Sequence, residues 1–227
     1  MNWHALQLRS LKTRVTVFTL TILVLGFGSL AFYASRMLRD DMQRLTGEQQ
    51  FSAVSVLAAS INDELANRIA ALELVAGAID ASLLGRPAAL QNLLDQKIGL
   101  PVYFNAGVHI VGRDGVAVAD VSEAGRVGKS FADNQAVQAV LSGQKRSVVG
   151  GPLMGPLLKQ PVFPIVTAIV DDQGRSIGAL IGTTSLAKPN FLDKIAQSHY
   201  GDSGGYYLAA PLHDLIVTAS DKSRTMQ

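Results

Sequence analysis

The chain contains an uncharged run that is long enough to cross a lipid bilayer. Residues 15–35, between Arg14 and Arg36, are 21 consecutive amino acids without a charge. At about 1.5 Å of rise per residue they would form a helix of about 31 Å, which matches the hydrocarbon core of a bilayer, about 30 Å thick. We therefore predict a transmembrane helix at 15–35, preceded by a cytoplasmic tail at 1–14.

The flanks of this run leave its processing and its orientation open. The small residues Ser29 to Ala31 also fit a signal-peptide cleavage site, although the apolar run continues past them to full spanning length. Positive residues flank the run in equal numbers: Arg9, Lys12 and Arg14 before it, and Arg36, Arg39 and Arg44 after it. Because the positive-inside rule counts these residues, charge alone does not orient the helix.

A helical pattern continues beyond the apolar run. Apolar residues recur every three or four positions, on one helix face: Val54, Ala58, Ile61, Leu65, Ile69, Leu72, Val75 and Ile79. Polar residues, Arg68 among them, fall largely off this stripe, and the first break comes at the Gly-Arg-Pro sequence of 85–87. The pattern predicts a long amphipathic stalk helix over residues 36–84.

Composition excludes several classes of function. The chain of 227 residues has no cysteine, so disulfides, thiolate metal sites and cysteine nucleophiles are excluded. Its net charge is +2 and it has no block rich in Lys and Arg, so we expect no nucleic-acid partner. The four histidines, which are His4, His109, His199 and His213, lie far apart without a carboxylate at ligand spacing. We therefore expect neither a metal site nor a cofactor.

Residues 85–219 alternate between strand pairs and short helices. Asp-Gly turns separate the predicted strands 102–111 and 116–121, and a similar turn at 171–174 separates 162–170 from 176–185. Further strands are predicted at 146–149, 206–210 and 215–219, and short helices at 88–98, 131–141 and 190–197. This order predicts an α+β fold with an antiparallel sheet. One face of such a sheet needs a cover, for which the apolar stripe of the stalk helix is suited.

Three segments of this region resemble the double Cache sensor domains of bacterial membrane receptors. They are residues 104–120 (FNAGVHIVGRDGVAVAD), 178–186 (GALIGTTSL) and 188–218 (KPNFLDKIAQSHYGDSGGYYLAAPLHDLIVT). The resemblance extends over residues 38–227. It implies an extracytoplasmic domain of two stacked PAS-like modules on one long helix, with ligand bound in the membrane-distal module. Residues 85–219 would be that distal module.

The length of the stalk suggests a second module. Residues 38–79 would extend about 63 Å as one helix, whereas a module of about 130 residues is about 30 Å across. A membrane-proximal module beyond Gln227 would account for the excess length. We therefore expect residues 220–227 to be a connector and the chain to be truncated within the double Cache domain.

One string resembles a catalytic motif. Residues 201–205 (GDSGG) match the nucleophile segment of trypsin-like serine proteases, but Tyr206 stands where those enzymes have proline. No segment around His109 or His199 resembles the protease histidine segment. A Gly-rich turn explains the string better, because Gly supplies positive φ and Asp or Ser bonds the backbone. We expect no catalytic site in this chain.

A ligand pocket in the PAS-like module is the favoured site. A cleft on such a sheet is mostly apolar with a few polar groups, and a helix and a loop cover it. The segments expected to face it are residues 131–137, residues 146–154 and the strands around Phe163 and Thr183. Arg126, Arg146 and Lys159 are candidates to hold an anion, although each is also explained as a solvated charge. Tyr103 and Phe163 are candidates for stacking or for the core. The full set of candidates is Tyr103, Arg126, Asp133, Arg146, Met154, Lys159, Phe163, Thr167 and Thr183.

The sequence departs from the amino-acid-sensing members of the family that it resembles. Those members carry an Arg and a Trp near the segment that corresponds to 131–138, and an Asp that pairs with the ligand ammonium near the position of Thr183. Here residues 131–135 read FADNQ, and Thr183 is followed by Thr184. The chemistry for an α-amino acid is therefore not visible. A carboxylate, a polyol, another neutral metabolite and no ligand at all stay open.

The sequence thus favours a periplasmic ligand sensor anchored in the bacterial inner membrane. The resemblance implies a homodimer that pairs through the stalk helix and regulates a cytoplasmic diguanylate cyclase outside this chain. The alternatives are the sensor of a chemoreceptor or a histidine kinase, and a dimerisation or interaction ectodomain without a ligand.

Overall fold

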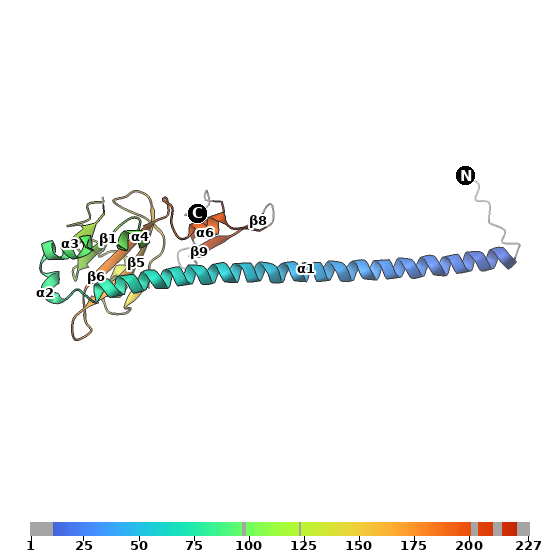
Figure 1. The fold of residues 1–227 in the computed structure, drawn as a ribbon, viewed down its shortest axis with the longest axis horizontal. Coiled ribbons are helices and arrows are strands. Elements are labelled where there is room, and N and C mark those ends of the chain that lie inside the picture. Colours follow the sequence, from blue (N-terminus) through green and yellow to red (C-terminus); the bar gives the residue numbers. More distant parts are fainter. Residues whose placement is uncertain (1–10, 97–98, 123, 201–203, 211–214, 222–227) are drawn as a thin grey trace. The chain divides into compact units, whose positions relative to one another are not determined.

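The computed structural model describes residues 11–96, 99–122, 124–200, 204–210 and 215–221. Contacts within the chain divide it into two units, residues 1–55 and 56–227. The first helix, α1 (Leu11–Ala76), runs through both units (Figure 1). All described residues of the first unit belong to this helix and are exposed.

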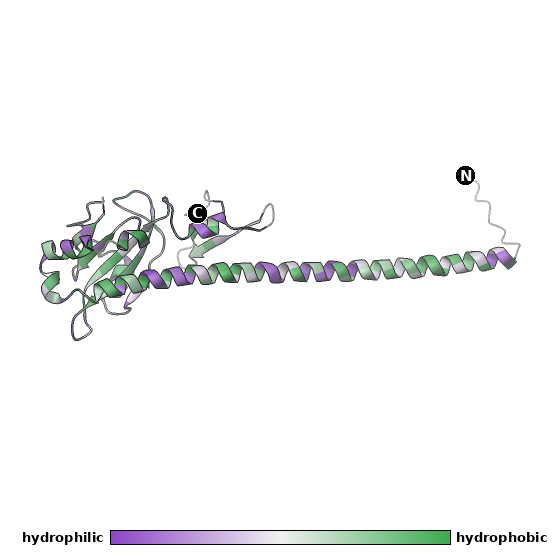
Figure 2. Ribbon diagram, in the orientation of Figure 1, coloured by the Kyte–Doolittle hydropathy of each residue, from purple (hydrophilic) through white to green (hydrophobic). Residues whose placement is uncertain are grey.

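The first part of α1 is long and apolar enough to cross a membrane, and it is the only such segment in the described part of the chain. Figure 2 shows its predominantly hydrophobic colouring. Three threonines of this segment donate their hydroxyls to backbone carbonyls four residues earlier, at 2.8–2.9 Å: Thr16 to Lys12, Thr19 to Val15 and Thr21 to Val17. Since hydrocarbon offers no hydrogen-bond partners, these internal bonds make the threonines compatible with lipid.

The long helix ends earlier than its sequence pattern predicts. Helix α1 stops at Ala76, and a separate turn of helix, α2 (Ala81–Leu84), follows. Asp80 starts this turn from an extended backbone, and its carboxylate accepts hydrogen bonds from the backbone N–H of Leu83 at 2.7 Å and the hydroxyl of Ser82. A carboxylate is a strong N-cap, so Asp80 favours a new helix start over continuation. The predicted boundary at residue 84 is therefore wrong.

The second unit is built on an antiparallel sheet of six strands. In the order β2-β1-β6-β5-β3, each strand is hydrogen-bonded to the next, and β4 also pairs with β5. The strands are β1 (Val108–Gly112), β2 (Ala117–Val121), β3 (Ser147–Val149), β4 (Leu153–Met154), β5 (Pro161–Val170) and β6 (Ser176–Ser185). The sheet and its short helices confirm the predicted α+β class.

Short helices and two hairpins complete the second unit. The helices are α3 (Pro87–Asp95), α4 (Leu100–Tyr103), α5 (Gln135–Leu141) and α6 (Asp193–Gln197). The hairpins pair β7 (His199–Tyr200) with β8 (Gly204–Gly205) and β9 (Tyr207–Ala210) with β10 (Leu215–Ala219). Helix α4 corrects the predicted strand at 102–111, because Pro101 stands in the first turn of a helix and the strand begins only at Val108.

The central strands β5 and β6 are buried on both faces. Toward α1, side chains from α1, β1, β5 and β6 form one hydrophobic cluster that includes Leu72, Phe104, Ile110, Ile165 and Leu180. On the opposite face, α5 packs over a second cluster that includes Val111, Val137, Val140, Val166 and Ile181. The expected cover from the stalk stripe is therefore present, but it accounts for only one of the two buried faces.

A charged residue of α1 also lies on the buried face. The polar pattern places Arg68 off the stripe, whereas its exposure is only 6%. Arg68 donates from Nη1 to the Glu64 carboxylate at 2.6 Å and from Nε to the Tyr103 carbonyl at 3.3 Å. Its guanidinium also lies 3.8 Å from the centroid of the Phe191 ring. These partners compensate the burial of the charge, so Arg68 belongs to the buried face although the apolar pattern leaves it off the stripe.

The packing of β6 against Phe104 predicts the effect of a single methyl group. A Cβ at Gly182 would overlap the buried ring of Phe104. We expect Gly182→Ala to lower the free energy of unfolding by about 3 kcal/mol, because overpacking a filled core displaces its neighbours. Urea denaturation of the detergent-solubilised chain measures this change.

Gly47→Ala is the matched control, because nothing lies within 4 Å of its Cβ position in α1. It should leave stability unchanged or raise it slightly. Equal stability of the Gly182→Ala and Gly47→Ala variants would contradict the close contact between β6 and Phe104.

Candidate ligand-binding site

A cavity of about 340 Å³ lies over the face of the sheet that is opposite α1. Its floor comes from β1, β5 and β6, and its walls from β4, the loop after it and the segment that leads into α5. The lining residues are His109, Arg126, Ser130, Phe131, Asp133, Asn134, Val137, Leu153, Gly155, Pro156, Leu157, Leu158, Val162, Pro164, Val166, Ile181 and Thr183. Ligand sites in proteins commonly have about 300–1,000 Å³ and a mostly apolar lining.

The alternation of side chains along the strands decides which residues reach the cavity. Val162, Pro164 and Val166 of β5 point to it, whereas the residues between them belong to the cluster on α1. Ile181 and Thr183 follow the same rule on β6. Since successive side chains of a strand point to opposite faces, the apolar floor is a direct consequence of register.

The segment before α5 is held in place by a helix cap. Asn134 has an extended backbone, and its side-chain oxygen accepts hydrogen bonds from the N–H groups of Ala136 at 2.9 Å and Val137 at 3.3 Å. Asparagine is a favoured N-cap residue, and Asn134 starts α5 in this way. The cap positions Phe131 and Val137 at the cavity wall.

A buried ion pair closes one side of the cavity. Nη1 of Arg126 lies 3.0 Å from Oδ1 of Asp120, and both side chains are less than 5% exposed. The guanidinium also donates to the hydroxyl of Ser122 at 2.7 Å and to the carbonyl of Ala106 at 2.7 Å. The charge of Arg126 is therefore compensated by protein groups before any ligand binds.

His109 is a buried polar residue on the floor of the cavity. Its exposure is 2%, and neither ring nitrogen has a hydrogen-bond partner among the described residues. The ring lies against Phe131, with 4.6 Å between the ring centroids. Burial, with a smaller contribution from the charge of Arg126, holds the pKa of His109 well below its ordinary value of 6.5. The imidazole is therefore neutral, with one nitrogen that donates and one that accepts.

Three of the nine residues predicted for the site line the cavity. Arg126 and Thr183 are buried in its wall and floor, and Asp133 is an exposed residue at its rim. Residues 131–137 and the strand around Thr183, which were expected to face the cleft, contribute to its lining. The other six predicted residues lie elsewhere.

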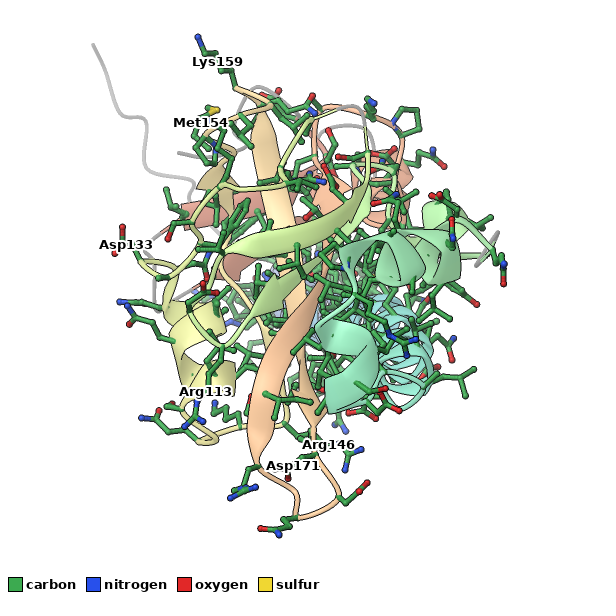
Figure 3. All side chains as sticks on the ribbon, turned by 90° about the vertical axis from the view of Figure 1, so that its left-hand side faces the viewer. Arg113, Asp133, Arg146, Met154, Lys159 and Asp171 are labelled. Carbon is green, nitrogen blue, oxygen red and sulfur yellow. The ribbon has the colours of Figure 1, made fainter. Side chains whose placement is uncertain are left out.

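Three of these six residues are exposed. Figure 3 shows Met154 and Lys159 at one end of the module and Arg146 at the other. Leu153 and Met154 are neighbours in β4, so their side chains point to opposite faces, and Leu153 lines the cavity in place of Met154. Arg146 and Lys159 keep their charges in solvent, so the solvated reading of both residues fits the structure better than an anion site in this cavity.

The other three residues lie on the side of the sheet that faces α1. Phe163 is a member of the core cluster on α1, and Thr167 is hydrogen-bonded to Ser147, which donates to Glu73 of α1. The carbonyl and the ring of Tyr103 both contact Arg68 of α1. Strand parity explains the first two placements: Phe163 and Thr167 alternate with the residues of β5 that face the cavity.

His109 is not among the residues predicted for the site, although the alternation of its strand carries a signal for it. Val108 and Ile110 flank it in a strand of apolar residues, and alternation places His109 on the face opposite to both. A single histidine among apolar strand residues is compatible with a filled core, and only the tertiary structure shows the cavity above it. Among the described residues, no group of three or more His, Asp or Glu side chains could hold a metal.

Comparison with models of protein families and with curated proteins gives no match. Solved structures do match. The ligand-binding domain of the Pseudomonas fluorescens chemoreceptor CtaA, in complex with L-serine, is 23% identical with a TM-score of 0.60, covering 76% of this chain and 71% of that chain. The ligand-binding domain of the Pseudomonas aeruginosa chemoreceptor PctB, in complex with L-Gln, is 21% identical with a TM-score of 0.60, covering 76% of this chain and 68% of that chain. The sensor domain of the V. cholerae histidine kinase DctB is 16% identical with a TM-score of 0.59, covering 81% of this chain and 69% of that chain.

These likenesses establish the fold. The chain shares with these solved domains an α+β fold, in which a long N-terminal helix precedes an antiparallel sheet with short helices. The similar chains belong to chemoreceptors and to a histidine kinase, and several of them are complexes with amino acids.

The buried ion pair predicts a stability effect. Asp120→Asn would leave the guanidinium of Arg126 buried without its counter-charge, so we expect the free energy of unfolding to fall by about 3–5 kcal/mol. Asp171→Asn is the control, because Asp171 pairs with Arg175, whose side chain is 71% exposed. Because solvent screens the exposed guanidinium of Arg175, this pair should contribute much less to stability than the buried one. Comparable losses in the two variants, measured by urea denaturation, would contradict the buried pair.

The neutral state of His109 predicts a pH dependence of stability. Below pH 6.5 the imidazole takes up a proton in the unfolded chain but not in the folded one, so the folded state loses stability as the pH falls. From about pH 7.5 to about pH 5.5 this loss should reach about 1 kcal/mol. His109→Leu should lack this component, and denaturation curves of both proteins at the two pH values measure it. Identical pH dependence in both would contradict a neutral buried imidazole.

Proposed function

We propose that this chain is the ligand-sensing part of a membrane-anchored bacterial signalling receptor. The observation that carries the proposal is the cavity, which the fold places between the sheet and α5 and lines with apolar side chains around one buried histidine. The fold of Cache-type ligand-binding domains supports this proposal. In this reading, residues 15–35 anchor the chain in the inner membrane and residues 85–219 are the periplasmic sensor module.

Hydrogen bonds between the sheet and α1 offer a route for the signal. Ser147 of β3 interacts with Thr167 of β5 and donates to Glu73 of α1 at 2.8 Å. Lys194 of α6 donates to Glu64 of α1 at 3.2 Å, and this bond, after that from Arg68, lowers the pKa of Glu64. A ligand that binds one arrangement of the sheet better than another would shift these contacts and α1 with them. We propose that α1 transmits this shift toward the membrane.

The receptor is proposed to act as a homodimer. In the first unit, Leu38, Met42 and Leu45 are exposed and follow each other at spacings of four and three residues. Such spacing suits the seam between two parallel helices. The proposed output is a cytoplasmic diguanylate cyclase, for which the resemblance of the sensor sequence is the support. A chemotaxis module and a histidine kinase are the alternatives, and both kinds of receptor occur among the similar structures.

A second candidate is an interaction ectodomain that binds no small molecule. The fold alone is compatible with it. The cavity favours the sensor, because an interaction domain has no need for a space of about 340 Å³ beside its core.

Ligand binding is tested by blocking the cavity. A metabolite library at millimolar concentration should contain compounds that raise the melting temperature of the detergent-solubilised chain, since a ligand at about 100 times its Kd adds about 2.7 kcal/mol of stability. Thr183→Phe extends a ring from β6 into the cavity and should abolish these shifts while the chain stays folded. Thr183→Val, which keeps the volume of the side chain, should retain binding to any ligand that does not bond the hydroxyl.

The blocking variant also separates the two candidate functions. A library without a single stabilising compound would contradict the sensor and favour the interaction ectodomain. Shifts that persist in Thr183→Phe would show that the compounds bind elsewhere.

A further inference from the structure

His109 and the charges around it restrict the kind of ligand that the cavity can hold. Buried polar groups in folded proteins almost always have a hydrogen-bond partner. Both ring nitrogens of His109 are buried, lack a partner among the described residues, and belong to a side chain that lines the cavity. A molecule in the cavity can supply the missing partner.

The charges of the lining do not select a charged ligand. Three lining residues are titratable: His109, Arg126 and Asp133. Arg126 is paired with Asp120 at 3.0 Å and bonded to Ser122 and Ala106. Asp133 is exposed, and Figure 3 shows it at the periphery of the module, where water solvates its carboxylate. An anion or a cation on the floor would therefore lose its water without gaining an unpaired counter-charge.

Apart from the hydroxyl of Thr183, the rest of the floor is aliphatic. Val162, Pro164, Val166 and Ile181 surround the histidine, and Phe131 lies against its ring. These groups favour an apolar body, whereas the imidazole favours one neutral group that can donate or accept a hydrogen bond.

We propose that the cavity binds an uncharged, largely apolar small molecule, and that His109 hydrogen-bonds the neutral polar group of this ligand. The inference rests on the proposed sensor function and adds the chemical class of the ligand to it. His109 is the specificity-determining residue: a primary amide satisfies either tautomer of its ring, whereas a carboxylate or an ammonium finds no unpaired counter-charge on the floor.

Three probes of the same shape test the class of the ligand. Benzamide, benzoate and benzamidinium share one aromatic ring and differ in charge at neutral pH. Titration calorimetry on the detergent-solubilised full chain should show that benzamide binds at least about ten-fold more tightly than either ion. A ten-fold difference corresponds to about 1.4 kcal/mol of hydration free energy that the ion loses and the cavity does not replace. If benzoate or benzamidinium binds as tightly as benzamide, the neutral class is wrong while the ligand-binding function stands.

Two substitutions test the role of His109. His109→Leu should weaken benzamide binding about ten-fold, because the leucine offers no hydrogen bond. Thr184→Val is the matched control: the hydroxyl of Thr184 is also buried without a partner among the described residues, but this residue does not line the cavity. Its removal should leave affinity unchanged. Unchanged affinity in His109→Leu, or an equal loss in Thr184→Val, would overturn the assignment.

A measurement on the unsubstituted chain covers the case in which His109→Leu fails to fold. With ¹⁵N-labelled histidine, saturating benzamide should move the ring nitrogen resonances of one histidine, which is identified as His109 through the variant His109→Gln. Ring resonances that do not move would overturn the proposal. The absence of binding by all three probes would also overturn it, whereas the metabolite library decides separately whether the domain binds any ligand.

Discussion

The burial of β5 and β6 on both faces is the constraint on which the second unit depends. Strands with two buried faces need two covers, and the chain provides two that differ in extent. The last turns of α1, together with α3, α4 and the residue that follows α4, cover one face, on which Leu72 of α1 and Phe104 after α4 are fully buried. On the other face α5 has only seven residues and covers part of the sheet, so the loop after β4 completes the cover at a distance. The cavity is the space left by this unequal covering.

The two faces also use charge differently. Toward α1, Arg68 is buried against Glu64, the Tyr103 carbonyl and the Phe191 ring. Its contacts with Tyr103 and Phe191 connect α1 to α4 and to the segment before α6. Toward the cavity, Arg126 is buried against Asp120 and fixes the loop after β2. In both places a guanidinium satisfied by several acceptors stabilises irregular backbone that apolar packing alone would not hold. Both charges are already compensated by protein groups, so His109 and the hydroxyl of Thr183 are the remaining polar groups on the floor of the cavity.

Local patterns predicted most of the elements and the α+β class. Turns that contain Asp and Gly predicted the hairpins around residues 113–115 and 171–174, and the apolar stripe predicted the buried face of α1 from Ile61 onward. The errors lie where side-chain hydrogen bonds override periodicity. Asp80 ends the long helical pattern by capping a new turn, and Arg68 enters the core because acceptors from distant segments surround it. Such partners come from tertiary structure and have no signature in the local sequence.

The candidate site was predictable only to the level of segments. The expected region included residues 131–137 and the strand around Thr183, but a shift of one residue exchanges the faces of a strand, so Phe163 and Met154 were selected in place of Val162 and Leu153. The same parity placed His109 opposite Ile110, yet parity cannot distinguish a filled face from a hollow one. That distinction depends on the short reach of α5, which begins only after the Asn134 cap. The position of a helix cap therefore determines whether the histidine is a core residue or the floor of a binding site.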